Sequence, residues 1–96
     1  MIIAKVVGSA VSSVKHDALR SSKLLLVQPA DEHGAASGSP FLAVDLVGAG
    51  EGELVAVTQG SSARVALGNG AGPIDAVVVG ILDCLYVEGT LSFRKE

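Results

Sequence analysis

Short apolar segments alternate along the chain with turns of glycine, serine and proline, and no long stretch repeats with the helical period of about 3.6 residues. This pattern predicts a succession of short β-strands. The predicted strands lie at about residues 2–12, 23–29, 41–47, 53–59 and 75–87, with a final extended piece at 90–94. Polar or glycine-rich connections separate them at 13–22, 29–40 and 69–73.

The segment GSSARVALG, residues 60–68, departs from the strand pattern. Ser61 or Ser62 can cap the free N–H groups of a first helical turn, and Gly68 can end the helix in a left-handed conformation. We therefore predict one short helix near 61–67. Five or six short strands with one small helix predict a mainly all-β fold, a small five-stranded OB-like β-barrel.

The two faces of each predicted strand indicate how the strand packs. In the first strand one face is assigned to the barrel interior, and its residues are Ile2, Ala4, Val6, Gly8 and Ala10. In the last long strand both faces are apolar, and Asp83 is the one charged residue between Ala76 and Val87. An antiparallel strand with one side in water should instead alternate apolar and polar residues. Two apolar faces indicate that the outside of the barrel is also covered, most simply by another copy of the chain.

The composition also indicates association with other chains. The 96 residues are expected to form a single domain, 1–96, in which 49% of the residues are hydrophobic, 18% are charged and the mean hydropathy is +0.53. A chain of this length hides only about 60–65% of its unfolded-state surface when it folds alone. Because the chain has more apolar residues than a small barrel easily buries, we expect an oligomer.

Charge and composition argue against several other partners. The net charge is −3, the seven basic residues are scattered singly, and the three aromatic residues are Phe41, Tyr86 and Phe93. Proteins that bind nucleic acid usually present a basic face with aromatic stacking residues, so we expect no nucleic acid partner. No apolar stretch reaches the roughly 18 residues of a membrane span, and the N-terminal segment lacks the pattern of a signal peptide, so we expect no membrane partner. A single cysteine favours a reduced, cytoplasmic location.

The most distinctive motif is DLVGAGEGELV at residues 45–55, in which Gly48, Gly50 and Gly52 occupy alternate positions. A dinucleotide-binding loop requires GxGxxG after a strand and then a helix, so that the helix N-terminus meets the pyrophosphate. Here Glu53 stands in the place of the third glycine, and a predicted strand follows. The glycines are therefore interpreted as a turn between two strands, and no cofactor is predicted.

No group of residues predicts a catalytic centre. Cys84 lies inside an apolar strand without a cationic neighbour in sequence and is interpreted as a buried, unreactive thiol. Ser61 and Ser62 are better explained as helix caps than as nucleophiles. The segment DEH at 31–33 lies in a polar loop, where three adjacent side chains rarely converge on one metal ion, so a solvated loop is favoured. We predict that the protein is not an enzyme and has no catalytic residues and no metal.

Six stretches carry a resemblance that covers nearly the whole sequence. In chain order they are AKVVG (4–8), KLLLVQP (23–29), AVDLVGAGEGELV (43–55), GSSAR (60–64), PIDAVVVGILD (73–83) and FRKE (93–96). The most specific combination is VGAG and GE in one turn, followed within about ten residues by GSSAR. Together these stretches resemble the vertex proteins of bacterial microcompartments, the EutN/CcmL family.

The resemblance implies a small OB-like β-barrel that assembles as a homopentamer. Such pentamers cap the five-fold vertices of polyhedral protein shells that enclose enzymes. The implied function is structural, in the shell of a bacterial microcompartment in the cytoplasm. Hexameric and trimeric shell proteins are the expected neighbours, because flat hexagonal tiling closes only where five-fold units introduce curvature.

The resemblance also implies two groups of functional residues. The axial pore loop consists of Gly48, Ala49, Gly50, Glu51 and Gly52, and the subunit-interface residues are Ser61, Ser62 and Arg64. Two alternatives stay open. Glu51 either points at the five-fold axis, where five copies would form a negatively charged ring, or points outward as a solvated turn residue. Arg64 is either a solvated cation or a residue that hydrogen-bonds the neighbouring chain.

Two other classes of function are weighed against this one. An OB-type binding module for single-stranded nucleic acid or oligosaccharide would need aromatic and basic residues on one strand face, which the composition does not favour. A small thiol enzyme would need a reactive, accessible Cys84.

Overall fold

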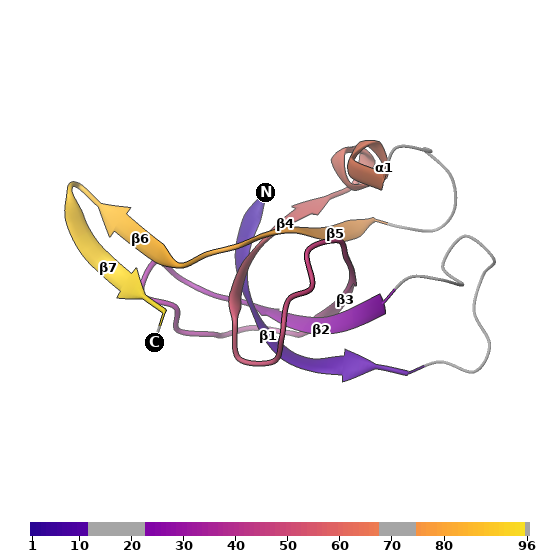
Figure 1. Cartoon of the computed structure of the whole chain (residues 1–96), viewed down its shortest axis with the longest axis horizontal. Helices are drawn as coiled ribbons and strands as arrows, with labels where there is room; N and C mark the ends of the chain where they lie inside the picture. The colour runs from indigo at the N-terminus through magenta and orange to yellow at the C-terminus, as the bar shows by residue number, and fades with distance from the viewer. Residues whose placement is uncertain (12–22, 68–74, 96) are drawn as a thin grey trace.

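Seven strands and one short helix make up the part of the chain that the computed structural model describes, residues 1–11, 23–67 and 75–95 (Figure 1). The elements are β1 (Ile2–Ala10), β2 (Lys23–Pro29), β3 (Phe41–Asp45), β4 (Leu54–Gln59), α1 (Ser61–Leu67), β5 (Ala76–Ile81), β6 (Cys84–Val87) and β7 (Thr90–Arg94). The predicted helix is confirmed. The predictions for the connection at 13–22, the turn at 69–73 and Gly68 lie outside the described residues.

Five of the strands close into a barrel with the order β1-β2-β3-β5-β4. Neighbouring strands are antiparallel except for β3 and β5, which run parallel. This confirms the predicted small five-stranded barrel, since five strands are the number expected of an OB-like fold. In the described part of the chain, no helix is long and apolar enough to span a membrane.

The barrel interior is filled by small and branched aliphatic side chains. The fully enclosed residues of this core include Ala4, Val6, Val27, Val55, Val57 and Val78. In β1 every second residue was predicted to face the barrel interior. This holds as far as Val6 and not beyond it. A bulge between Val6 and Gly8 pairs Gly8 with Leu26, whose neighbours Leu25 and Val27 face the core, so Gly8 lies on the outer face rather than inside.

A second cluster lies outside the barrel wall, under α1. Ala63 of the helix packs against Val44 of β3 and Val77 of β5, and all three are buried. Both faces of β5 are therefore covered within one chain at Val77. The interpretation that a second copy covers this face is wrong here, because the helix that follows β4 provides the cover.

The predicted strand at 75–87 is in fact two strands in different sheets. β5 ends at Ile81, and the Leu82 N–H donates to the Leu54 carbonyl at 2.9 Å. The chain then leaves the barrel at Asp83, whose carbonyl accepts a hydrogen bond from the Lys95 N–H at 2.7 Å. Strands β6 and β7 form a separate two-stranded hairpin, which projects from one end of the barrel (Figure 1).

Candidate functional site

The glycine loop, residues 46–53, joins β3 to β4 and is held in place by the last residue of β3. The Asp45 carboxylate accepts hydrogen bonds from the Val47 N–H and the Ala49 N–H, both at 3.1 Å. This arrangement is typical of aspartate at the start of a turn. Ala49 is buried with the barrel core, so the loop folds back over the barrel instead of extending into solvent.

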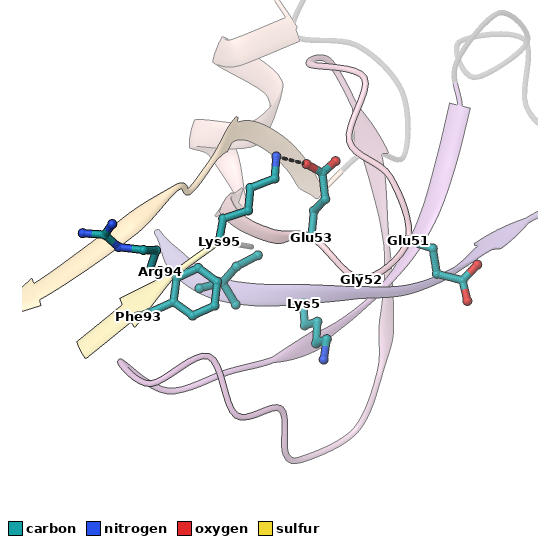
Figure 2. Close-up of a pocket in the computed structure, with 8 residues that line it drawn as sticks. Lys5, Glu51, Gly52, Glu53, Phe93, Arg94 and Lys95 are labelled. Atoms are coloured by element: carbon teal, nitrogen blue, oxygen red, sulfur yellow. Dashed lines mark hydrogen bonds and ion pairs between the residues drawn. The ribbon is translucent and has the colours of Figure 1, made fainter. Parts of the chain in front are cut away.

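Glu53 fixes the other side of the glycine loop. Its carboxylate accepts a hydrogen bond from the Gly50 N–H at 2.6 Å and an ion-paired hydrogen bond from the Lys95 ammonium at 2.5 Å (Figure 2). The Gly52 N–H donates to the Val6 carbonyl at 2.8 Å, which ties the loop to β1. The loop is therefore a rigid part of the barrel rim.

These contacts use several backbone N–H groups of the glycine loop within the chain itself. A phosphate-binding loop needs backbone N–H groups that point at the ligand. Here the N–H groups of Val47, Ala49 and Gly50 are bonded to carboxylates of the same chain, and that of Gly52 is bonded to a carbonyl. The interpretation of the motif as a turn between strands is confirmed.

Two glycines of the loop are required by backbone conformation. Gly48 has φ of 75° and Gly52 has φ of 90°, in the left-handed region that glycine adopts without steric cost. A Cβ at either position would meet no atom of the described part of the chain within 4 Å, apart from its chain neighbours. Glu51, between them, is exposed and points away from Glu53 and Lys95 (Figure 2).

A pocket lies between the glycine loop and the end of β7. Its lining residues are Lys5, Glu51, Gly52, Glu53, Leu54, Phe93, Arg94 and Lys95. The Lys5 and Arg94 side chains point away from the Glu53–Lys95 pair, so the cations do not converge on one point (Figure 2). The pocket is therefore interpreted as the junction between barrel and hairpin, and not as a ligand site.

The ion pair shifts the pKa of both partners. The Lys95 ammonium and, to a lesser degree, the Gly50 N–H lower the pKa of Glu53 below its ordinary value of 4.5. The Glu53 carboxylate raises the pKa of Lys95 above its ordinary value of 10.5. Each group thus keeps its charge over a wider pH range in the folded protein than in the unfolded chain.

We expect the Glu53 contribution to stability to depend on pH. Because the pKa of Glu53 is lowered by folding, its contribution is present above pH 4.5 and is lost as the pH falls through the folded-state pKa. In urea denaturation, Glu53→Gln should be less stable than the wild type at pH 7, and this difference should shrink as the pH falls below 4.5. Glu51→Gln is the matched control, since it removes the same charge from a side chain that points away from Lys95. A difference that stays constant from pH 7 into the acid range would contradict the ion-pair explanation.

The predicted interface residues lie on α1. Ser61 and Ser62 are exposed at its first turn, and the Ala63 N–H donates to the Gly60 carbonyl at 3.1 Å. Arg64 belongs to the helix, but its side chain lies outside what the structure describes. The site residues are thus on two separate surfaces, the glycine loop and α1.

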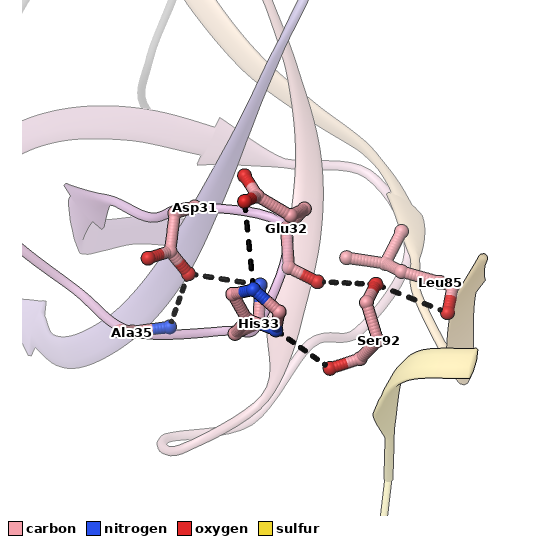
Figure 3. Close-up of polar contacts among 6 residues, drawn as sticks. All are labelled: Asp31, Glu32, His33, Ala35, Leu85 and Ser92. Carbon is pink, nitrogen blue, oxygen red and sulfur yellow. Dashed lines mark hydrogen bonds and ion pairs between the residues drawn. The ribbon is translucent and has the colours of Figure 1, made fainter. Parts of the chain in front are cut away.

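Cys84 differs from its prediction, whereas the segment 31–33 lies in an exposed loop as predicted. Cys84 is a free thiol that is half-buried, so full burial is wrong, and strand pairing sets it opposite Arg94. Asp31 accepts hydrogen bonds from the His33 and Ala35 N–H groups at 2.9 and 3.0 Å, and these lower its pKa (Figure 3). The carboxylate therefore closes a turn. Among the residues that the structure describes, no three His, Cys, Asp or Glu side chains gather as metal ligands.

Comparisons with known proteins show the family of the chain. A family model described as "Ethanolamine utilisation protein EutN/carboxysome" matches residues 1–83. The chain belongs to the EutN/CcmL family. The resemblance inferred from the motifs is thereby confirmed.

Relatives within the EutN/CcmL family are similar over nearly their whole length. The carboxysome shell vertex protein CcmL of Nostoc sp. is 46% identical, with 100% of this chain and 96% of that protein covered. The bacterial microcompartment shell vertex protein EutN of Salmonella typhimurium is 40% identical, with 99% and 96% covered.

Solved structures of family members have the same fold. The structure of CcmL from Nostoc sp. has a TM-score of 0.91 at 47% identity, covering 99% of this chain and 100% of that chain. GrpN from Rhodospirillum rubrum, described as a pentameric microcompartment shell protein, has a TM-score of 0.81 at 44% identity, covering 91% of this chain and 99% of that chain.

Proposed function

We propose that this protein is a structural shell protein whose homopentamers cap the five-fold vertices of a polyhedral bacterial microcompartment. The observation that carries the proposal is full-length similarity to shell vertex proteins, one of them described as pentameric. In this function the protein catalyses no reaction. Its partners are further copies of itself and the hexameric and trimeric proteins of the same shell.

The vertex function follows from geometry. A flat hexagonal layer cannot close, and a five-fold unit supplies the curvature at each corner. Such a unit needs rigid subunits with complementary edges, and the closed barrel with its anchored glycine loop supplies the rigidity. The shell is therefore the proposed location.

Two surfaces are assigned within the pentamer as part of this proposal. The loop from Gly48 to Gly52 borders a narrow axial pore, where open space around Gly48 and Gly52 allows other copies to approach closely. Ser61, Ser62 and Arg64 lie at the subunit boundary, for which the exposed first turn of α1 is suited.

The distribution of aromatic residues argues against the OB-type binding module. Phe41 packs against the barrel core, and the Phe93 ring lies against Gly34. Tyr86 is the one aromatic side chain of the three that is largely exposed. A single ring does not provide the row of stacking surfaces that single-stranded nucleic acid binding uses.

Native mass spectrometry tests the proposal. At micromolar protomer concentration we expect one dominant species with five times the chain mass of 9.6 kDa. A spectrum with only monomer or dimer would contradict the vertex function. A salt-dependent gel shift with oligonucleotides would instead favour the binding module.

A further inference from the structure

The tip of the β6–β7 hairpin carries apolar side chains that the described part of its own chain leaves exposed. Tyr86 is 64% exposed, and its cross-strand partner Leu91 is 40% exposed. Val87, which follows Tyr86 in β6 and points to the opposite face of the hairpin, is 43% exposed. A two-stranded hairpin is at most marginally stable in water by itself. The tip therefore favours a partner that covers these side chains.

The base of the hairpin, in contrast, is fixed to the barrel. The Ser92 hydroxyl donates to the Glu32 carbonyl at 2.6 Å, and the His33 Nδ1 atom lies 3.4 Å from the Ser92 carbonyl oxygen (Figure 3). The Phe93 ring packs on Gly34. Because its base is held, the hairpin presents its tip in one direction, away from the barrel (Figure 1). A preorganised surface of this kind loses little entropy on binding.

A second apolar surface lies on the outer wall of the barrel. Strand pairing sets Gly8, Leu26 and Leu42 side by side across β1, β2 and β3. Leu42 is 50% exposed, and Leu26 is half-buried beside it. Gly8 has no side chain, and a Cβ there would lie 3.9 Å from the Leu26 side chain, so Gly8 is on the same face as Leu26 and leaves that side chain open to contact from another molecule. We call these three residues the outer row.

A closed ring of identical subunits requires two different surfaces that fit each other, because each subunit contacts one neighbour with each surface. The hairpin tip and the outer row are candidates for such a pair, because one is a projecting surface with an exposed aromatic ring and the other is an exposed apolar part of the barrel wall. We propose that Tyr86 and Leu91 of each subunit pack on the outer row, Gly8, Leu26 and Leu42, of the neighbouring copy. This inference rests on the proposed pentamer and adds a second contact between neighbouring subunits to the boundary proposed at α1.

Mixing two variants tests this pairing directly. Tyr86→Lys disables the tip, and Leu42→Lys disables the outer row. Each lysine reduces the magnitude of the net charge of −3, so general repulsion between subunits does not increase. Each variant alone is expected not to form the pentamer. Replacing an anchor side chain such as an interface tyrosine weakens each contact between subunits by about thirtyfold or more. An equimolar mixture should form a 1:1 heterodimer and no ring, because a single intact tip meets a single intact outer row.

The controls separate this inference from the proposed function. If the wild type is not pentameric, the proposed function fails first. If the wild type is pentameric and either variant keeps the ring at the same protomer concentration, or if the mixture stays monomeric, the pairing of these surfaces is overturned. Tyr86→Phe keeps the aromatic side chain, and Leu42→Met keeps the apolar volume. Both variants should assemble as the wild type does. Leu91→Lys is a second tip variant, for use should Tyr86→Lys not fold.

Discussion

Replacing Gly34 with alanine is expected to lower the free energy of unfolding by about 2–3 kcal/mol, since both backbone strain and a clash oppose the new side chain. Gly34 has φ of 81°, which side chains with a Cβ rarely adopt. The added Cβ would lie 2.6 Å from Cδ1 and 2.8 Å from Cε1 of Phe93. The Phe93 ring must therefore move, which loosens the hairpin from the loop at 31–36.

Gly38→Ala is the matched control for this prediction. Gly38 lies in the same loop with φ of 94°, but a Cβ there meets only Cγ of Pro29 at 3.9 Å. Gly38→Ala should lower the free energy of unfolding by about 1 kcal/mol, because backbone strain alone opposes the new side chain. Chemical denaturation at equal protomer concentration measures both variants, because assembly adds to the apparent stability. If the two variants lose the same unfolding free energy, the clash with Phe93 does not add to the destabilisation by Gly34→Ala.

The interior of the barrel was predictable because it depends on local alternation. Ala4 and Val6 face inward as the period of two requires, and α1 begins where Ser61 follows Gly60. The bulge after Val6 was not predictable, because a bulge depends on how two strands pair and not on the pattern of one strand.

The division of the last long strand was hidden by its composition. Residues 76–87 are apolar almost throughout, and Asp83 alone indicates a possible break. The break is fixed by contacts with distant segments, from Leu82 to Leu54 and from Lys95 to Asp83. The apolar run therefore predicted burial correctly near Val77 but not which sheet each part joins.

In the candidate site too, local contacts could be predicted from the sequence and contacts between distant residues could not. Asp45 precedes the N–H groups that it binds by two and four residues, so the turn it forms could have been recognised from the sequence. Glu53 and Lys95 are 42 residues apart, and no local signal connects them. The pairing of Glu53 with the end of the chain could only be found in the folded structure.

The contact between α1 and the barrel gives the second large prediction. Ala63 is fully buried between Val44 and Val77, so the outer cluster has no space for a larger side chain. Ala63→Leu should lower the free energy of unfolding by about 1–3 kcal/mol, since overpacking forces the helix away from β3 and β5. The displacement would also move Ser61 and Ser62, which the proposed pentamer sets at a subunit boundary.

Ala66→Leu separates packing from helix propensity. Ala66 lies on the exposed side of the same helix, so both substitutions change the intrinsic helix propensity by the same small amount. Ala66→Leu should leave the unfolding free energy within about 0.5 kcal/mol of the wild type. Denaturation at equal protomer concentration measures the stability, and native mass spectrometry measures the ring. If both variants are equally stable, α1 does not pack tightly on the barrel, and the explanation of how one chain covers the outer face of β5 fails.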